Sequence, residues 1–181
     1  YLKDTVRLAA GLTPDNFLDE ESQLRALACL KRFGERLRGL PAHAVRVVGT
    51  NTFRLAKNAT AFLEKAEDAL GFPIEIIAGR EEARLIYLGV ANCMPPSQNN
   101  RLVVDIGGGS TECVIGEGLE PLRMESLYMG CVSYSKRFFG DGKITKDAMR
   151  QAELAARMEL QTIRFEFSGG NWQEAIGSSG T

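Results

Sequence analysis

Histidine and tryptophan are almost absent from this sequence, and its few cysteines are widely spaced. The 181 residues include one His, one Trp and four Cys, and no two cysteines form a C-x-x-C pair. Structural zinc sites and disulfide frameworks need clustered cysteine or histidine ligands, so neither is expected. We therefore expect reduced thiols and a cytoplasmic location.

The chain also lacks an excess of either charge, and it lacks long apolar runs. Lys and Arg number 22 against 23 Asp and Glu, and no apolar stretch approaches the roughly 18 residues of a membrane-spanning helix. A surface that coats polyanions is thus disfavoured, so phosphate binding would need a local site. Because the chain starts at Tyr1 and stops within a turn-forming run, we expect a fragment of a longer protein.

The apolar periodicity predicts an α/β fold. In the first half, patterns typical of strands alternate with patterns typical of helices, whereas short strands dominate the second half until one long helix. The predicted strands cover residues 2–8, 45–48, 74–77, 102–106, 113–115 and 122–127, and the predicted helices cover residues 20–37, 58–70, 81–90 and 146–167. A segment rich in proline and asparagine over residues 93–100 is the best linker candidate, which predicts a boundary between residues 1–100 and 101–181.

Glycine is abundant, with 19 residues, and its most informative cluster follows a predicted strand. Residues 105–112 read Asp-Ile-Gly-Gly-Gly-Ser-Thr-Glu. Three successive glycines let backbone N–H groups converge on one anion, and the two hydroxyls add donors for phosphate oxygens. The run matches neither a Walker loop nor the dinucleotide fingerprint, because no Gly-Lys-Ser/Thr ends it and a strand follows it. A plain glycine hairpin is the alternative.

Carboxylates stand at both ends of this glycine loop. Asp105 and Glu112 would repel a phosphate group unless a cation lay between them. Magnesium is the natural cation, because it binds through few carboxylates together with waters and phosphate oxygens. The loop therefore predicts a magnesium-dependent phosphate site.

The sequence resembles the family of exopolyphosphatases and guanosine pentaphosphate phosphohydrolases. The likeness extends over essentially the whole chain. It is carried by residues 49–54 (Gly-Thr-Asn-Thr-Phe-Arg), 74–87, 105–112, 129–133 (Met-Gly-Cys-Val-Ser) and 177–181. Within the family, Gly109 and the run over residues 49–52 are more similar to exopolyphosphatases.

The resemblance implies an actin-like fold, of the ribonuclease H-like and sugar-kinase type, with two α/β domains that are incomplete at both ends of this chain. Residues 1–100 would be the C-terminal part of the first domain, and residues 101–181 the N-terminal part of the second. It also implies magnesium-dependent hydrolysis of the terminal phosphoanhydride bonds of inorganic polyphosphate. The full-length protein would be a homodimer, cytoplasmic or peripherally associated with the membrane.

The resemblance assigns roles to individual residues. Glu82 matches the family's catalytic glutamate, the base for the attacking water, although it is also a first-turn acid that would stabilise a helix dipole. Arg54 matches a phosphate-contacting arginine, with a surface arginine as the alternative. The loop and the chain end complete the predicted site. Its phosphate-binding residues are Gly107, Gly108, Gly109, Ser110, Thr111, Gly177, Ser179, Gly180 and Thr181, and its metal ligands are Asp105 and Glu112.

Three other functions would use the same glycine loop. The first is the same hydrolysis acting on guanosine pentaphosphate. The second is a kinase-like transfer of phosphate from ATP to a small acceptor, and the third is a phosphate-sensing module without catalysis. Loop composition does not separate these alternatives.

Overall fold

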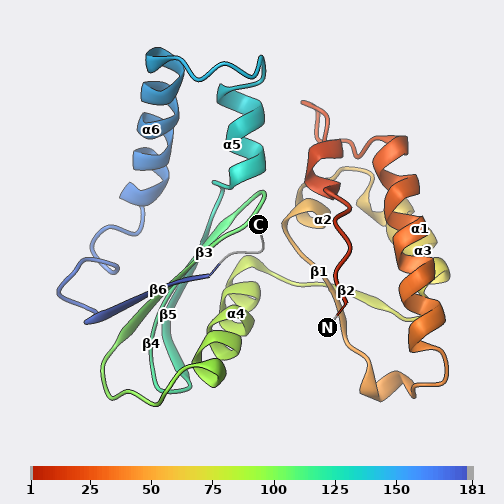
Figure 1. Ribbon diagram of the computed structural model, residues 1–181, viewed down its shortest axis with the longest axis horizontal. Helices are drawn as coiled ribbons and strands as arrows, with labels where there is room; N and C mark the ends of the chain where they lie inside the picture. The colour runs from red at the N-terminus through yellow and green to blue at the C-terminus, as the bar shows by residue number, and fades with distance from the viewer. Residues whose placement is uncertain (1, 179–181) are drawn as a thin grey trace. The chain divides into compact units, whose positions relative to one another are not determined.

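The computed structural model describes residues 2–178 (Figure 1). The chain divides into two compact units, Tyr1–Ile77 and Ala78–Thr181. This division falls earlier than the predicted boundary near residue 100. The reason is packing: the helix at residues 79–93 contributes Ala83 and Tyr87 to the core of the second unit and therefore belongs to it.

Two helices and two short strands form most of the first unit. Helices α1 (Glu20–Leu37) and α3 (Ala59–Leu70) pack on each other, and strands β1 (Val47–Gly49) and β2 (Ile74–Ile76) pair in parallel. The short helix α2 (Asn51–Leu55) and the 3-10 helices η1 (Leu8–Gly11) and η2 (Ala42–Ala44) connect them.

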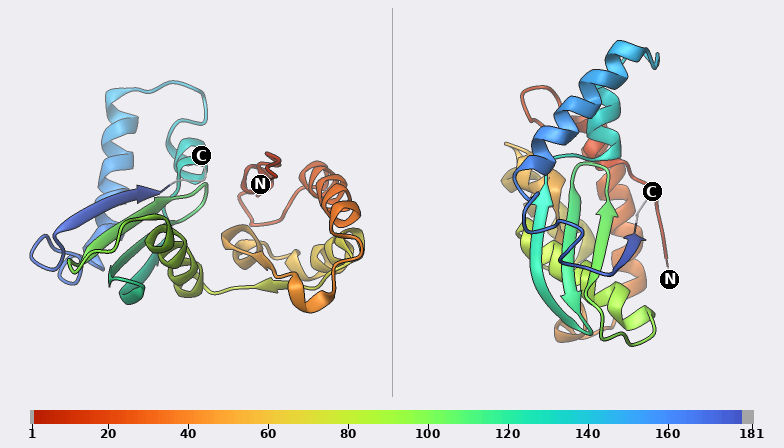
Figure 2. Two further views of the ribbon diagram at one scale, coloured as in Figure 1. Left: turned by 60° about the horizontal axis from the view of Figure 1, so that its bottom comes forward. Right: turned by 90° about the vertical axis from the view of Figure 1, so that its left-hand side faces the viewer.

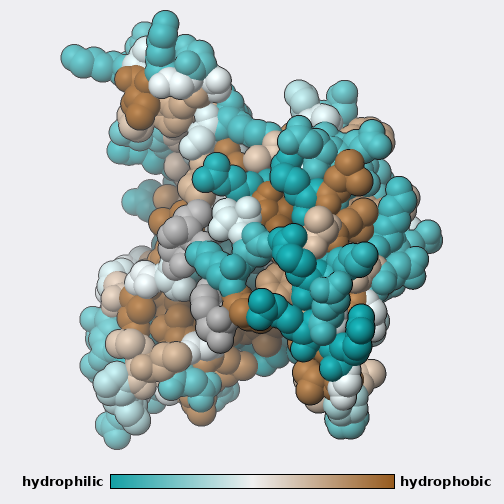
Figure 3. Space-filling model, turned by 45° about the vertical axis from the view of Figure 1, so that its right-hand side comes forward, coloured by the Kyte–Doolittle hydropathy of each residue, from teal (hydrophilic) through white to brown (hydrophobic). Residues whose placement is uncertain are grey.

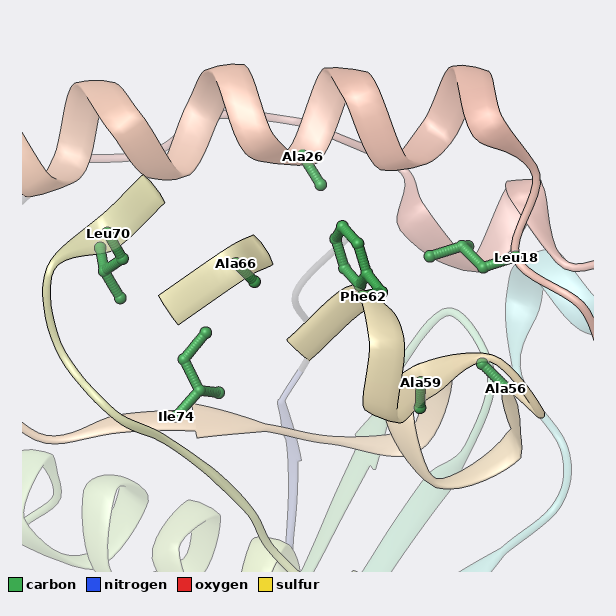
Figure 4. Close-up of a cluster of buried hydrophobic side chains, with 8 residues drawn as sticks. All are labelled: Leu18, Ala26, Ala56, Ala59, Phe62, Ala66, Leu70 and Ile74. Carbon is green, nitrogen blue, oxygen red and sulfur yellow. The ribbon is translucent and has the colours of Figure 1, made fainter. Parts of the chain in front are cut away.

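Local sequence explains where these helices begin and end. Asp19 caps α1, because its carboxylate accepts a hydrogen bond from the backbone N–H of Ser22 at 2.7 Å. Gly71 ends α3 in the left-handed conformation, with a φ of 80°, which glycine adopts without steric cost. The apolar faces of the helices meet in a core of Leu18, Ala26, Ala56, Ala59, Phe62, Ala66, Leu70 and Ile74 (Figure 4).

The strand predicted over residues 2–8 is wrong. Residues 2–7 form no strand within the described chain, and a 3-10 helix begins at Leu8. The side chains of Val6 and Leu8 still pack against the first core. The apolar alternation in this segment therefore reflects the burial of Val6 and Leu8, and residues 2–7 pair with no strand in the described chain.

A mixed four-stranded sheet forms the centre of the second unit (Figures 1 and 2). Strands β3 (Arg101–Ile106), β4 (Thr111–Glu117) and β5 (Glu120–Leu127) are antiparallel neighbours, and β6 (Glu174–Ser178) pairs in parallel with β3. The strand order is β5-β4-β3-β6. In the described part of the unit, up to residue 178, the helices are α4 (Gly79–Cys93), α5 (Cys131–Phe138) and α6 (Lys146–Gln161).

Different helices cover the two faces of this sheet. Helix α4 covers one face, where Ala83 and Tyr87 pack on Val103 and Val114. On the other face, side chains of β3 and β4 line an apolar cavity of about 470 Å³ together with residues of α5 and α6. Since side chains alternate along strands, Asp105 and Glu112 share the α4 face with Val103 and Val114.

The first residue of β3 is a buried arginine fixed by an ion pair with the partly exposed Glu174. Arg101 is 5% exposed, and its Nε donates to Glu174 Oε2 at 2.6 Å, while its Nη2 donates to the carbonyl of Pro95 at 2.6 Å. Glu174 Oε1 accepts from Ser97 at 2.8 Å and from Asn99 at 3.1 Å. The segment predicted as a linker is thus a loop held against β3 and β6.

This ion pair predicts a loss of stability in acid. Hydrogen bonds from Arg101, Ser97 and Asn99 lower the pKa of Glu174 from 4.5 to about 2. Because the pKa is lower in the folded state, the charged carboxylate stabilises the fold above about pH 4.5, and this contribution is lost as the pH falls toward 2. Glu174→Gln should therefore lower the melting temperature at pH 7, and the difference from the parent should shrink between pH 4.5 and pH 2.

Thermal melts of both proteins across this pH range measure the effect. Glu120→Gln, at the exposed start of β5, is the control and should leave the melting temperature unchanged. A constant difference between Glu174→Gln and the parent at every pH would contradict the prediction.

Hydrophilic and hydrophobic residues are interspersed over the face shown in Figure 3. Among the helices of residues 2–178, none combines the length and apolarity needed to cross a membrane.

Candidate active site

The glycine loop joins β3 to β4 and is closed by its own backbone. The N–H of Gly107 donates to the carbonyl of Ser110 at 3.0 Å. Ser110 and Thr111 are 4% and 3% exposed, so the loop is buried where it enters β4. The Thr111 hydroxyl donates to the carbonyl of Met129 at 2.7 Å. The Thr111 hydroxyl, which the sequence predicts to donate to a phosphate oxygen, therefore donates its proton to the protein backbone instead.

The N-terminus of α5 holds the loop from one side. The N–H of Cys131 donates to the Gly107 carbonyl at 3.0 Å, and the N–H groups of Val132 and Ser133 donate to the Gly108 carbonyl at 2.9 and 3.0 Å. These bonds satisfy donors that a helix start otherwise leaves without partners. The loop carbonyls therefore point toward α5.

The opposite ends of the same peptide groups lie where the sequence predicts an anion site. In a trans peptide the N–H is antiparallel to the C=O, so the N–H groups of Gly108 and Gly109 point away from α5. No backbone carbonyl in residues 2–178 accepts from either of them. Two adjacent N–H donors facing outward are the elements of an anion nest, which supports the predicted use of these glycines.

Gly130 allows the loop and α5 to approach this closely. A Cβ at residue 130 would lie 2.5 Å from the Gly109 nitrogen and 2.6 Å from the carbonyl carbon and oxygen of Gly108. Real Cβ atoms essentially never come so near to backbone atoms. Gly130 is thus required for the loop conformation, a role that the sequence motif alone did not reveal.

Three carboxylates gather on the α4 face beside the loop. Asp105 and Glu112 are direct partners in the β3–β4 register, and Glu112 is 1% exposed. Burial raises the pKa of Glu112, hydrogen bonds from Ser126 and Ser110 lower it, and the negative charges of Glu82 and Asp105 raise it further. Glu82 and Asp105 therefore both lie within electrostatic range of Glu112, as their predicted roles in one site require.

Glu82 and the neighbouring Glu81 have different interactions. Both are in the first turn of α4, but Glu81 accepts two hydrogen bonds from the Arg84 guanidinium, each of 2.8 Å. The charge of Glu82 acts on Glu112. The first turn of α4 thus carries one acid that pairs with Arg84 and one whose charge reaches the buried Glu112.

Arg54 belongs to the first unit. It lies on α2, and its Nη1 donates to the carbonyl of Ile77 at 2.9 Å, just after β2. In the same helix Asn51 is 6% exposed, and its Oδ1 has no hydrogen-bond partner among the described residues. The phosphate contact of Arg54 stays a prediction.

The final glycine-rich run begins as a strand. Gly177 and Ser178 are in β6, where they pair in register with Val104 and Asp105. Because β6 is parallel to β3, both strands end at the edge of the sheet that carries the glycine loop. The other predicted residues of this run, Ser179, Gly180 and Thr181, lie outside the described residues.

The donor set fits magnesium in the presence of a phosphate substrate. Within residues 2–178, no group of three His, Cys, Asp or Glu side chains is arranged to hold a metal ion. Magnesium in phosphate-transfer sites typically takes one or two carboxylates and completes its shell with water and substrate oxygens. Asp105 and Glu112 meet that requirement, and the metal site stays a prediction.

A mixed sheet with helices on both faces, and a glycine loop at the carboxyl end of one of its parallel strands, places the chain in the α/β class predicted from the sequence. The chain belongs to the Ppx/GppA phosphatase family, whose sequence profile matches residues 1–181. The predicted family and fold class are therefore confirmed.

Solved structures of this family are similar to the chain. An exopolyphosphatase-like protein is 26% identical, with a TM-score of 0.85 over 96% of this chain and 55% of its own. An exopolyphosphatase from Cytophaga hutchinsonii is 27% identical, with a TM-score of 0.80 over 95% and 55%. The Aquifex aeolicus PPX-GPPA enzyme is 28% identical, with a TM-score of 0.71 over 96% and 56%. The chain thus spans about half the length of these proteins.

Proposed function

We propose that the protein hydrolyses the terminal phosphoanhydride bond of inorganic polyphosphate and releases phosphate. The observation that carries this proposal is the placement of two outward N–H groups, on Gly108 and Gly109, next to the carboxylates of Glu82, Asp105 and Glu112. A site that combines anion donors with carboxylates suits the attack of water on a bound phosphate. Similarity to a solved exopolyphosphatase supports this choice of substrate.

The residues divide the work of hydrolysis among them. The N–H groups of the loop bind non-bridging oxygens of the terminal phosphate and oppose the charge that builds up on them. Glu82 orients a water molecule and accepts its proton as the water oxygen bonds to phosphorus and the bridging P–O bond breaks. A magnesium ion held by Asp105 and Glu112 would supply charge neutralisation on the phosphate oxygens.

Guanosine pentaphosphate is the second candidate substrate. The family name covers both activities, and the Aquifex aeolicus relative is a PPX-GPPA enzyme. The terminal phosphoanhydride of guanosine pentaphosphate would present the same phosphate oxygens to the glycine loop, so the hydrolysis described above applies to this substrate unchanged. The difference would lie in the recognition of guanosine.

Phosphate release from both substrates, measured side by side with the full-length protein, tests the proposal. We expect the higher kcat/KM with polyphosphate, loss of release in EDTA and recovery with magnesium. Turnover of guanosine pentaphosphate alone would favour the second candidate. Phosphorylation of an acceptor by ATP without hydrolysis, or binding of polyphosphate without release, would contradict a phosphohydrolase. Sedimentation of the same sample tests the proposed homodimer.

A further inference from the structure

Ser126 lies beside the buried carboxylate of the candidate site. It is on β5, directly opposite Glu112 in the register of β4 and β5, and its Oγ donates to Glu112 Oε1 at 2.8 Å. Glu112 is 1% exposed, so bulk water cannot take the place of this donor. The direction of the carboxylate therefore depends on its protein partners.

The hydrogen bond from Ser126 constrains the Glu112 carboxylate and leaves it able to accept further bonds. A carboxylate oxygen has two lone-pair sites, and a single hydroxyl occupies one of them. Ser126 of β5 donates to Oε1, and Ser110 of the glycine loop also hydrogen-bonds to the carboxylate. Two hydroxyl donors leave part of the acceptor capacity of the carboxylate unused. On the same face of β5, the preceding inward residue is Met124, which packs on the apolar core under α4. Along this face of β5, Met124 thus contacts the apolar core under α4, and Ser126, two residues further on, contacts the carboxylate of the candidate site.

We propose that Ser126 is a positioning residue that orients Glu112 for binding a divalent cation. The inference rests on the proposed function, in which Glu112 is one of two carboxylates available to the metal. Partners that orient a metal-binding carboxylate typically contribute about 10- to 100-fold to metal affinity or activity. A serine that served only to satisfy a buried carboxylate would affect stability and leave cation binding unchanged.

The second unit contains a matched control for this distinction. Ser97 Oγ donates to Glu174 Oε1 at 2.8 Å, the same chemical bond at the same length. Glu174 is at the start of β6, paired with Arg101, at the opposite end of β3 from the glycine loop. Ser97→Ala therefore removes an equivalent hydrogen bond without touching the candidate site.

The experiment measures Mn²⁺ binding to the full-length protein by electron paramagnetic resonance in the presence of inorganic phosphate, together with the Mg²⁺ concentration that gives half-maximal phosphate release. Ser126→Ala should weaken Mn²⁺ binding and raise the half-maximal Mg²⁺ concentration by about tenfold each. Ser126→Thr keeps the hydroxyl and should restore both values. Ser97→Ala should lower the melting temperature and leave both values at the parental level.

Parental Mn²⁺ affinity in Ser126→Ala, or an equal loss of affinity in Ser97→Ala, would overturn the inference. Parental Mn²⁺ affinity in Glu112→Gln would overturn it together with the metal assignment. Loss of Mn²⁺ affinity in both Glu112→Gln and Ser126→Ala, in a protein that does not hydrolyse polyphosphate, would support the positioning role and contradict only the proposed function.

Discussion

Replacing Glu82 with glutamine is expected to lower kcat for phosphate release by about 10³-fold, because a positioned general base contributes roughly 10²- to 10⁴-fold. Glutamine keeps the size of the side chain but cannot accept the proton of the attacking water. Glu82 is in the first turn of α4, and its charge acts on the buried Glu112. Because glutamine has the same shape, its substitution should lower phosphate release far more than it changes the melting temperature.

Glu81→Gln is the matched control for this prediction. Glu81 precedes Glu82 on the same helix turn, but its carboxylate is paired with Arg84. Its removal should cost a little stability and leave phosphate release near the parental rate. Steady-state kinetics and thermal melts of the two variants decide the point. Near-parental kcat in Glu82→Gln, or equal losses in both variants, would exclude Glu82 as the base.

Gly130→Ala is expected to displace the glycine loop and to lower phosphate release by about 10²-fold, the cost of moving binding groups by roughly 1 Å. The new Cβ would lie 2.5 Å from the Gly109 nitrogen and 2.6 Å from the Gly108 carbonyl. Backbone atoms cannot turn aside as a flexible side chain can, so the loop and α5 must separate. Overpacking of this kind costs about 1–3 kcal/mol of unfolding free energy.

Gly89→Ala provides the contrasting variant. Gly89 is exposed on α4, and apart from its chain neighbours and the backbone of its own helix, no atom lies within 4 Å of the Cβ that alanine would add. Alanine should stabilise the helix by about 1 kcal/mol relative to glycine and leave activity unchanged. Denaturant titrations give the two free energies, and phosphate release gives the activities. A Gly130→Ala protein with parental stability and kcat would show that the loop does not depend on this close approach.

The elements predicted well are those that short-range patterns determine. The helix predicted over residues 20–37 matches α1 (Glu20–Leu37), because its apolar spacing and its capping Asp19 both lie in the local sequence. Strand β6 was not predicted, since it exists through pairing with Arg101–Asp105, which is remote in the sequence. Helix α5 is short, and the N–H groups of its first turn donate to the carbonyls of Gly107 and Gly108, with a local capping bond from the Gly130 N–H to Ser133 Oγ.

The residues of the candidate site likewise fall into two groups, those that a local sequence pattern predicts and those that depend on contacts remote in the sequence. The glycine loop with Asp105 and Glu112 is continuous in sequence, so its composition was enough to predict an anion site. Counting through the β4–β5 turn would have paired Glu112 with Glu125, because the register shift between Ile115 and Gly116 moves its partner by one residue, to Ser126. No such count reveals Gly130, because its role depends on a tertiary contact with the loop.

The contact between α5 and the glycine loop has an electrostatic consequence. The peptide dipoles of a helix add up to a partial positive charge at its N-terminus. Here that end meets the carbonyls of Gly107 and Gly108, whose peptide groups continue the same head-to-tail alignment. Hydrogen-bonded peptide groups in series polarise one another. The positive end of α5 is thereby relayed through two peptide groups to the N–H groups of Gly108 and Gly109, so an anion at the loop would feel the field of a helix it does not touch.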